Sequence, residues 1–447
     1  MRTHLVNTMI DDINQFNNQK LNWFSTVREK RMGTLIILFM LFILFEGVLR
    51  KWLLSTLGQP LIFIREPILF LIYYFYLKDY GLNKKWFLPY LIFSSVLIIL
   101  SFIQGILYQY HILIPFLGLR FYILYIPLAF IMAEVLNLQQ TSRLIKVLLV
   151  TSVPIALLVF IQFISPVESS INKGLSDDVE GRFTVVEGIV RPYGPFTFVA
   201  GQANWAAFLL AILILCFDNR KKLNISKKII FLSLIPILLM GALSGARTYF
   251  VLAIIILFFY IISGLYARNF YKGIKRLVYL FLFLATFISV FIFLVPQAYE
   301  SMAQRQESAV ASEGSTIKRA LGNIAIESTD KLPFLGHGLG AGSNMGNALR
   351  GTQNFSLGEM EWGRVFNELG IVIGSLYLFI RTLFVFILGW LALKINKKYD
   401  DGSALILFGF VGPLLLAGQI TMQNQLLAIC WFAVGLQLVF MKLSKEK

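Results

Sequence analysis

The stretch FLGHGLGAGSN, at residues 334–344, is the first candidate for chemistry, because glycines at alternate positions shape a loop around one histidine. An imidazole titrates near neutral pH, so His337 is a candidate general base. A hydrogen-bonded loop histidine without a catalytic role is an equal alternative. The stretch lacks the strand-turn-helix setting of a dinucleotide fingerprint and the Lys-Ser/Thr pair of a Walker loop, so a nucleotide site is disfavoured.

A second candidate is the charged stretch GEMEWGRVFNELG, at residues 358–370, which leads into an apolar segment. Glu361, Arg364 and Glu368 are spaced at i, i+3 and i+7 and so share one helical face. A charged stripe that enters a membrane helix is costly unless it faces a polar cavity. The spacing therefore predicts an array of carboxylates and an arginine at the wall of a site.

Two arginines lie at the starts of other apolar segments. Arg191 and Tyr193 precede one of them in VRPYGPFTFVAGQANW, where prolines and glycine predict a turn that presents both at the membrane face. Taken alone, the stretch favours the alternative of an ordinary loop-to-helix junction with one interfacial arginine. Arg247 lies in the hairpin LSGARTYF. An arginine at such a position needs a partner, and an anionic ligand and a structural carboxylate are equal alternatives. We interpret Glu46 with Arg50, and Arg65 beside Glu66, as structural pairs.

These residues interrupt a chain that is 57% hydrophobic and only 14% charged over 447 residues, with a mean hydropathy of +0.73. Soluble domains are usually about one quarter charged. Apolar runs in hydrocarbon must form helices, which satisfy their own backbone groups. The sequence predicts an all-α polytopic membrane protein with about twelve spans. They are 33–49, 61–77, 87–107, 112–135, 144–164, 196–217, 229–244, 247–265, 277–296, 365–393, 403–418 and 424–441.

The net charge of +16 is explained by topology and not by nucleic-acid binding. With the N-terminus in the cytoplasm, the inner segments hold 25 of the 40 Lys and Arg residues, which is the positive-inside bias. Both termini are then cytoplasmic. The outer segments carry 11 Arg and four Lys, whereas the inner ones carry seven Arg and 18 Lys. Arginine offers a planar fork for phosphate or carboxylate, so the outer half is predicted to hold an anion. The alternative, which is compatible with the first, is that these arginines pair with local carboxylates such as Glu46, Glu66 and Glu361.

The predicted organisation has a polar tail at 1–32, a membrane domain at 33–296, a large outer loop at 297–364 and three further spans within 365–447. A second outer loop covers 165–195. The tail lacks a cleavable signal pattern, so span one is expected to act as a signal-anchor. Residues 300–330 are expected to form an amphipathic helix on the bilayer. Cys216 and Cys430 lie in apolar spans and indicate neither a disulfide nor a metal site.

The polar stretches, in this order, resemble the O-antigen polymerase and O-antigen ligase superfamily of bacterial envelope glycosyltransferases. The resemblance covers about residues 185–380, with RPYGPF before a span, SGAR at a hairpin, GHGLG in the large loop and E-W-x-R…ELG before span ten. EGVLRKW (46–52) and FIREP (63–67) are similar to an exopolysaccharide-polymerase-like subgroup. The ligase pattern has a histidine shortly before the next helix, and none lies between Asn344 and Arg364 here, which favours a polymerase over a ligase.

The resemblance implies a lipid-dependent (GT-C-like) glycosyltransferase architecture in the bacterial inner membrane, with its active site facing the outer leaflet. It implies a donor glycan on undecaprenyl pyrophosphate, a hydroxyl of another lipid-linked glycan as acceptor, no cofactor and no metal. A flippase and a chain-length regulator are implied as protein partners. A ligase, and a flippase or transporter of lipid-linked sugars, are the alternatives. Carried over, the catalytic residues are His337, Glu361 and Glu368, the pyrophosphate ligands are Arg191, Arg247 and Arg364, and the substrate ligands are Tyr193, Arg65 and Arg120.

Overall fold

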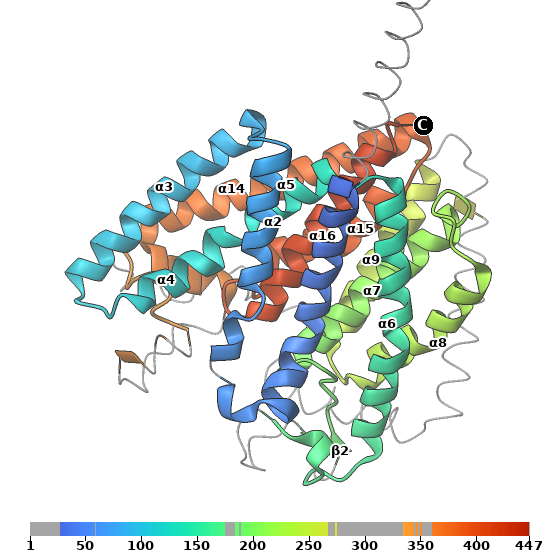
Figure 1. Cartoon of the computed structure of the whole chain (residues 1–447), viewed down its shortest axis with the longest axis horizontal. Helices are drawn as coiled ribbons and strands as arrows, with labels where there is room; N and C mark the ends of the chain where they lie inside the picture. The colour runs from blue at the N-terminus through green and yellow to red at the C-terminus, as the bar shows by residue number, and fades with distance from the viewer. Residues whose placement is uncertain are drawn as a thin grey trace, which may run out of the picture.

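The structure of the chain is a computed structural model, shown in Figure 1. It describes residues 27–58, 60–174, 184–186, 189–266, 273–274, 334–343, 346, 349–350 and 360–446. The predicted span at 277–296 and the predicted amphipathic helix at 300–330 lie outside the described residues, as does most of the large loop.

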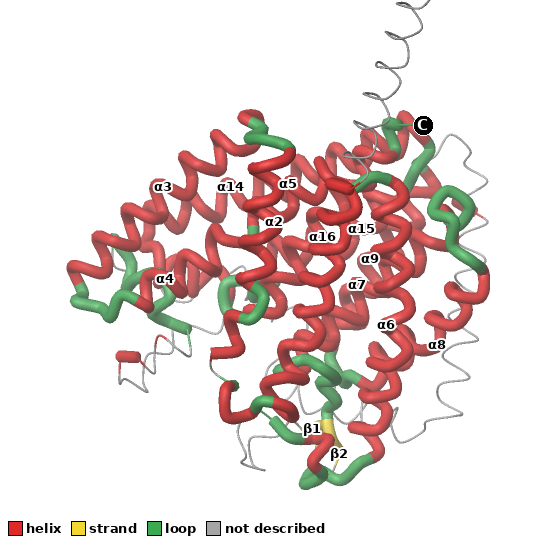
Figure 2. Tube along the Cα trace, in the orientation of Figure 1, coloured by secondary structure: helices red, strands yellow, loops and turns green. Residues whose placement is uncertain are grey.

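The described part of the chain is almost entirely helical (Figure 2), and nine of its helices are long and apolar enough to cross a membrane. A polytopic, all-helical membrane protein is therefore confirmed. The nine are Val27–Leu53, Pro60–Asp79 (ending in α2, Glu66–Asp79), α3 (Lys84–Leu107), Leu113–Val135 (α4, Leu113–Leu119, and α5, Ile126–Val135), α6 (Leu138–Ile164), α7 (Val199–Asn219), α9 (Arg247–Leu265), α14 (Glu361–Tyr399) and α16 (Asn424–Leu443). Two shorter helices, α8 (Lys227–Leu243) and α15 (Ser403–Ala417), coincide with two more predicted spans.

Several helices begin where the sequence supplies an N-cap. Asn83, Asn137 and Ser226 precede α3, α6 and α8, and each side chain accepts a bond from a first-turn amide. Such caps satisfy donors that the helix itself leaves unpaired. Two helices contain π-helical turns, at Leu49–Leu53 and Arg120–Leu124, and each turn carries a buried basic residue. Local π-turns are frequent at functional sites because they re-aim side chains.

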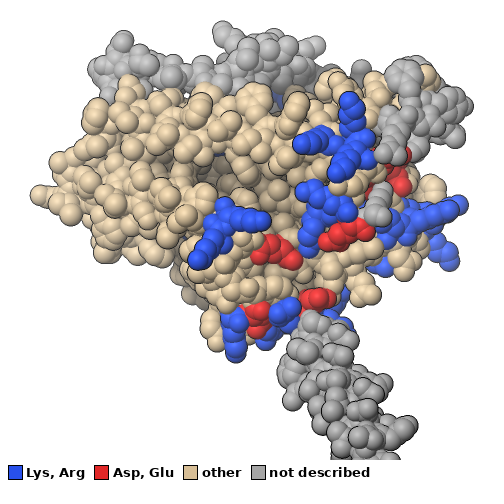
Figure 3. Space-filling view, turned by 90° about the horizontal axis from the view of Figure 1, so that it is seen from above, with Lys and Arg blue, Asp and Glu red and all other residues tan. Residues whose placement is uncertain are grey.

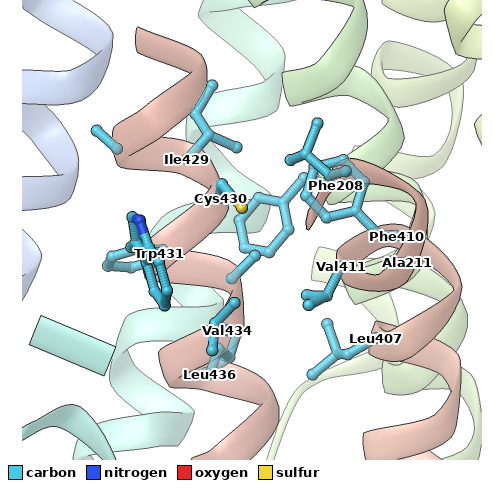
Figure 4. Close-up of a cluster of buried hydrophobic side chains, with 14 of the residues drawn as sticks. Phe208, Ala211, Leu407, Phe410, Val411, Ile429, Cys430, Trp431, Val434 and Leu436 are labelled. Atoms are coloured by element: carbon cyan, nitrogen blue, oxygen red, sulfur yellow. The ribbon is translucent and has the colours of Figure 1, made fainter. Parts of the chain in front are cut away.

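The core lies around α7 and α16. In the apolar 18-residue stretch of each helix, 94% and 89% of the residues are buried, respectively. Figure 4 shows Phe208 of α7 meeting Phe410 of α15 beside Cys430 of α16. Both cysteines are buried and free. By contrast, α3 and α14 lean away from the other helices in Figure 1 and leave apolar side chains exposed, such as Ile106 at 79% and Phe386 at 70%. These apolar surfaces are suited to contact with lipid.

The helices alternate between two ends of the bundle. At the first, which we call the basic end, Arg31 pairs with Asp79, and Lys222 pairs with Asp401 while donating to the carbonyl of Leu443. Figure 3, which views this end, shows the basic and acidic residues gathered over one part of it. The segments predicted to be cytoplasmic that the structure describes meet there. The candidate site residues lie toward the other end.

The predicted outer loop at 165–195 is described in part. A short 3₁₀ turn, Ser170–Asn172, is followed by a two-stranded antiparallel hairpin of β1 (Thr184–Val186) and β2 (Ile189–Val190). The hairpin leads directly into the segment that carries Arg191 and then into α7.

Candidate functional site

The charged stripe lies on a half-helix that folds back on the rest of α14. Gly370 has non-helical angles (φ 78°, ψ 176°) and interrupts the helix. Arg381 Nη1 lies 2.7 Å from Glu361 Oε1, although twenty residues of continuous helix would separate them by roughly 30 Å. The segment from Glu361 to Leu369 therefore turns back sharply at Gly370. The sequence predicted one helix entering span ten, and this break is what the periodicity did not reveal.

The glycine loop at 334–343 docks into that break. The His337 amide donates to the carbonyl of Asn367 at 2.6 Å, and the Gly338 amide donates to the carbonyl of Glu368 at 3.3 Å. A helix that ends leaves its last carbonyls without intrahelical partners. The loop amides supply those partners, so the loop caps the half-helix and is fixed by it.

The glycines are explained by close backbone packing. Gly336 has φ +73°, and a Cβ there would lie 2.3 Å from the carbonyl oxygen of Glu368. Gly340 has φ +79°, and a Cβ there would lie 2.5 Å from the amide nitrogen of Gly118 in α4. Side chains are excluded at both positions by conformation and by space. The alternating pattern thus reflects docking of the loop between α4 and α14.

The end of α3 anchors the same loop through three side chains. Buried Gln104 donates to the carbonyl of Glu368 at 2.8 Å and to that of Leu335 at 2.5 Å, and its oxygen accepts from the amide of Leu339 at 2.9 Å. Tyr108 and Tyr110 donate to the next two loop carbonyls, each at 2.8 Å. The backbone on both sides of the histidine is therefore held in place.

The imidazole itself is half-buried. Burial lowers the pKa of His337, and the positive charge of Arg350 lowers it further. Arg350 lies against the loop, with its Cζ atom 5.3 Å from the centre of the Tyr110 ring. A lowered pKa keeps the imidazole neutral, which is the form that accepts a proton.

On the half-helix, Glu368 is held by two donors and is almost fully buried. Arg364 approaches its Oε1 at 3.0 Å, and the hydroxyl of Tyr122 donates to Oε2 at 2.9 Å. Arg364 is itself buried, so the two charges form an internal pair. The structure brings Arg364, Glu368 and the backbone of the loop that carries His337 together.

Glu361 faces a different set of groups. In addition to Arg381, it accepts from the hydroxyl of Thr421 at 3.0 Å. The remaining donors of Arg381 bond to the carbonyls of Leu415 and Gly418. The start of the half-helix is thus bound to the loop between α15 and α16. Glu361 and Arg364 share a face by spacing, but their side chains have separate partners.

A third buried cluster contains the arginines near the start of the chain. Arg50 and Arg65 both pair with Glu46, each at 3.0 Å. Arg120 pairs with Glu66 at 2.6 Å. The sequence interpretation was correct for Arg50 but wrong in pairing Arg65 with its neighbour, because packing turns the two adjacent side chains toward different helices. Arg65 and Arg120 also both bond to Asn424, at 3.2 and 2.7 Å.

The segment before α7 is clamped by buried polar groups. Lys51 donates to the carbonyls of Gly194 and Phe196, at 2.8 and 2.7 Å, and the amide and hydroxyl of Thr197 donate to Gln425. Tyr193 is 1% exposed, and its hydroxyl donates to the carbonyl of Asn172. The prediction that Tyr193 is presented at the membrane face was wrong, because its ring fills the core beneath the turn.

Arg191 and Arg247 are both partly exposed, unlike the arginines of the buried clusters. Arg191 follows β2 directly, two residues before Tyr193. Arg247 is the first residue of α9. Arg247 therefore lies at the start of a helix, and Arg191 lies in the connection between β2 and α7.

Several residues of this region were missed as site components from sequence. Gln104 and Tyr122 are uncharged polar residues within predicted spans, and Lys51 lies just after the end of the first predicted span. An ionisable residue inside a predicted span is a signal for an internal partner, and Arg381 carries that signal. The amide and the hydroxyl carry none, because such groups are common on helices.

No protein-family model matches this chain, and no curated protein sequence matches it.

Proposed function

We propose that the chain is a membrane glycosyltransferase that polymerises polysaccharide. It transfers a glycan from undecaprenyl pyrophosphate to a hydroxyl of another lipid-linked repeat unit at the outer leaflet. The motif resemblance is one support for this proposal. The proposed function also accounts for the excess of arginine over lysine in the predicted outer segments, since a diphosphate leaving group is bound best by guanidinium forks.

The observation that carries the proposal is that three of the motif-bearing segments are joined to one another through buried contacts. Glu361 of the half-helix bonds to Thr421, and Thr197 of the RPYGPF segment bonds to Gln425 four residues later. The glycine loop is fixed to the other end of the same half-helix through Asn367. Segments that are far apart in sequence are thus held in one assembly, as a shared site requires.

In the proposed mechanism, Arg191 and Arg247 bind the pyrophosphate and stabilise the charge that develops as it leaves. His337, kept neutral by its surroundings, takes the proton of the acceptor hydroxyl. Glu368 and Arg364 hold the half-helix on which the loop rests. Arg65, Arg120 and Tyr193 are engaged with protein groups, and we assign them to the support of the site.

The direct test is to incubate the purified full-length protein with undecaprenyl-pyrophosphate-linked repeat units and to separate the products by size. A ladder of chain lengths is expected. Transfer of a finished chain to a second carrier would indicate a ligase instead. Absence of any new glycosidic bond would overturn the enzyme assignment and favour a transporter of lipid-linked sugars.

A further inference from the structure

The buried ion cluster beside α16 carries more positive than negative charge among the described residues. Arg50, Arg65 and Arg120 share only Glu46 and Glu66, and none of these side chains is more than 12% exposed. Guanidinium groups stay protonated in proteins, so the imbalance cannot be removed by titration. A buried charge without a counterion is strongly unfavourable.

The first turn of α16 adds further positive character at the same place. The N-cap residue of α16 makes no side-chain capping bond, and the first-turn amides have no intrahelical partner. A helix N-terminus carries the positive end of the helix dipole and favours anions. Both Arg65 and Arg120 already touch this turn, through the backbone and side-chain oxygens of Asn424.

One guanidinium nitrogen at this turn has no hydrogen-bond partner among the described residues. Arg65 is fully buried, with Nε facing Glu46 and Nη1 on the carbonyl of Asn424, and its Nη2 atom is unpartnered. Every nitrogen of Arg120 is engaged, with Glu66, Asn424 and the carbonyl of Ile62. The free donors at this place are therefore one guanidinium nitrogen and the backbone amides of the first turn of α16.

We infer that this turn is a binding site for a small monatomic anion, a halide such as chloride, held by Arg65 Nη2 and the first turn of α16. A two-nitrogen fork favours phosphate or carboxylate, whereas the single free nitrogen of Arg65 favours a monatomic anion. A halide would balance the surplus positive charge and would accept from both sets of donors. Glu66 Oε2 also lacks a hydrogen-bond partner, so a water joining it to Arg65 is the competing occupant. The inference does not depend on the proposed enzymatic activity.

The test measures thermal unfolding of the purified full-length protein in sodium gluconate, chloride and bromide at equal ionic strength. The midpoint is expected to rise with the logarithm of halide concentration, because only the folded state binds the ion. Asn424→Asp places a fixed carboxylate between the two arginines and is expected to abolish that dependence. Asn224→Asp, at an exposed loop position near the basic end, is the matched control and should retain it.

Crystals of the unaltered protein grown in bromide supply an independent measurement. An anomalous peak is expected within hydrogen-bond distance of Arg65 Nη2. Absence of that peak, or a midpoint that does not respond to halide, overturns the inference and leaves water as the occupant. Halide dependence that persists in a folded Asn424→Asp variant would also overturn it, by placing the effect elsewhere.

Discussion

At the scale of single residues, the buried arginines differ from the partly exposed ones. Arg65, Arg120 and Arg381 each have a carboxylate partner and at least one backbone carbonyl partner, so they bind helices to one another. Arg191, in the connection between β2 and α7, and Arg247, at the start of α9, are both partly exposed. Removing one member of a buried pair leaves an uncompensated charge and costs about 3–5 kcal/mol of stability. The exposed arginines are expected to matter for activity instead.

The two exposed arginines provide the first prediction. Arg191→Lys and Arg247→Lys should each reach the membrane in normal amounts and yet lose about 10²–10³-fold in polymerisation rate, because a point charge cannot replace a bidentate fork. The measurement is chain elongation per unit of purified protein. Arg143→Lys, at an exposed position near the basic end, is the control and should elongate normally. Near-normal elongation by either test variant would remove that arginine from the pyrophosphate site.

His337 provides a prediction on pH. Its folded-state pKa lies below the ordinary value of 6.5, so the neutral base persists at pH values where a free histidine is already charged. The acid limb of kcat/KM should therefore fall below pH 6.5. The unfolded chain binds the proton first, so the free energy of unfolding should decrease as the pH drops through this window.

Arg350→Gln removes one cause of the lowered pKa of His337. The acid limb of kcat/KM for this variant should therefore move upward toward pH 6.5. The pH profiles of the two proteins are compared under the same conditions. An unchanged limb in the variant would show that another group, and not His337, titrates in the rate profile.

At the scale of elements, the half-helix and the glycine loop form one unit built around Gly370. The break exposes the last carbonyls of the half-helix, and the loop amides together with Gln104 satisfy them. Neither element has a complete set of backbone bonds without the other. The loop is therefore expected to be as stable as the half-helix against which it docks, which is unusual for a glycine-rich segment.

Gly370→Ala tests this unit. A Cβ at this position would lie 2.2 Å from the carbonyl oxygen of Phe334, and the φ of +78° is unfavourable for alanine. Gly81→Ala is the matched control, because Gly81 has φ +75° with open space around it. Both variants bear about 1–2 kcal/mol of backbone strain, and only Gly370→Ala must also displace the loop. Thermal unfolding should show a clearly larger loss for Gly370→Ala, and equal losses would contradict the docking of the loop into the break.

At the scale of the whole molecule, the contacts group the helix ends into two sets. Lys442 bonds to the carbonyl of Leu136, and Ser142 bonds to that of Leu223, so the segments of the basic end are adjacent. The site segments meet at the other end through Thr421, Asn424 and Gln425. One measurement of which end of the bundle faces the cytoplasm therefore gives the membrane orientation of every described segment.

Cysteine labelling supplies that measurement. Gln109→Cys, between α3 and α4, should react with a membrane-impermeant maleimide in intact cells, whereas Asn224→Cys should react only after lysis. Both positions are exposed, and the native cysteines are buried and so give little background. The reverse pattern would place the candidate site in the cytoplasm and would contradict a donor at the outer leaflet.

The sequence alone determined the class of the molecule and most of its helices. Long apolar runs form helices in hydrocarbon, because a helix satisfies its own backbone groups. Hydrophobic patterning is a local property of the chain and does not depend on which segments pack together. The same is true of the Arg50–Glu46 pair, which joins residues four apart on one helix. Such features depend only on nearby positions in the chain.

Only the tertiary structure decided how the polar residues are partnered. Arg65 is bonded to Glu46 and to Asn424, 359 residues away, and Glu66 beside it is bonded to Arg120. The turn at Gly370 and the docking of the glycine loop likewise depend on backbone approaches between distant segments. A buried charge takes whichever partner the packing of several helices brings within reach, and residue spacing along one helix does not contain that information.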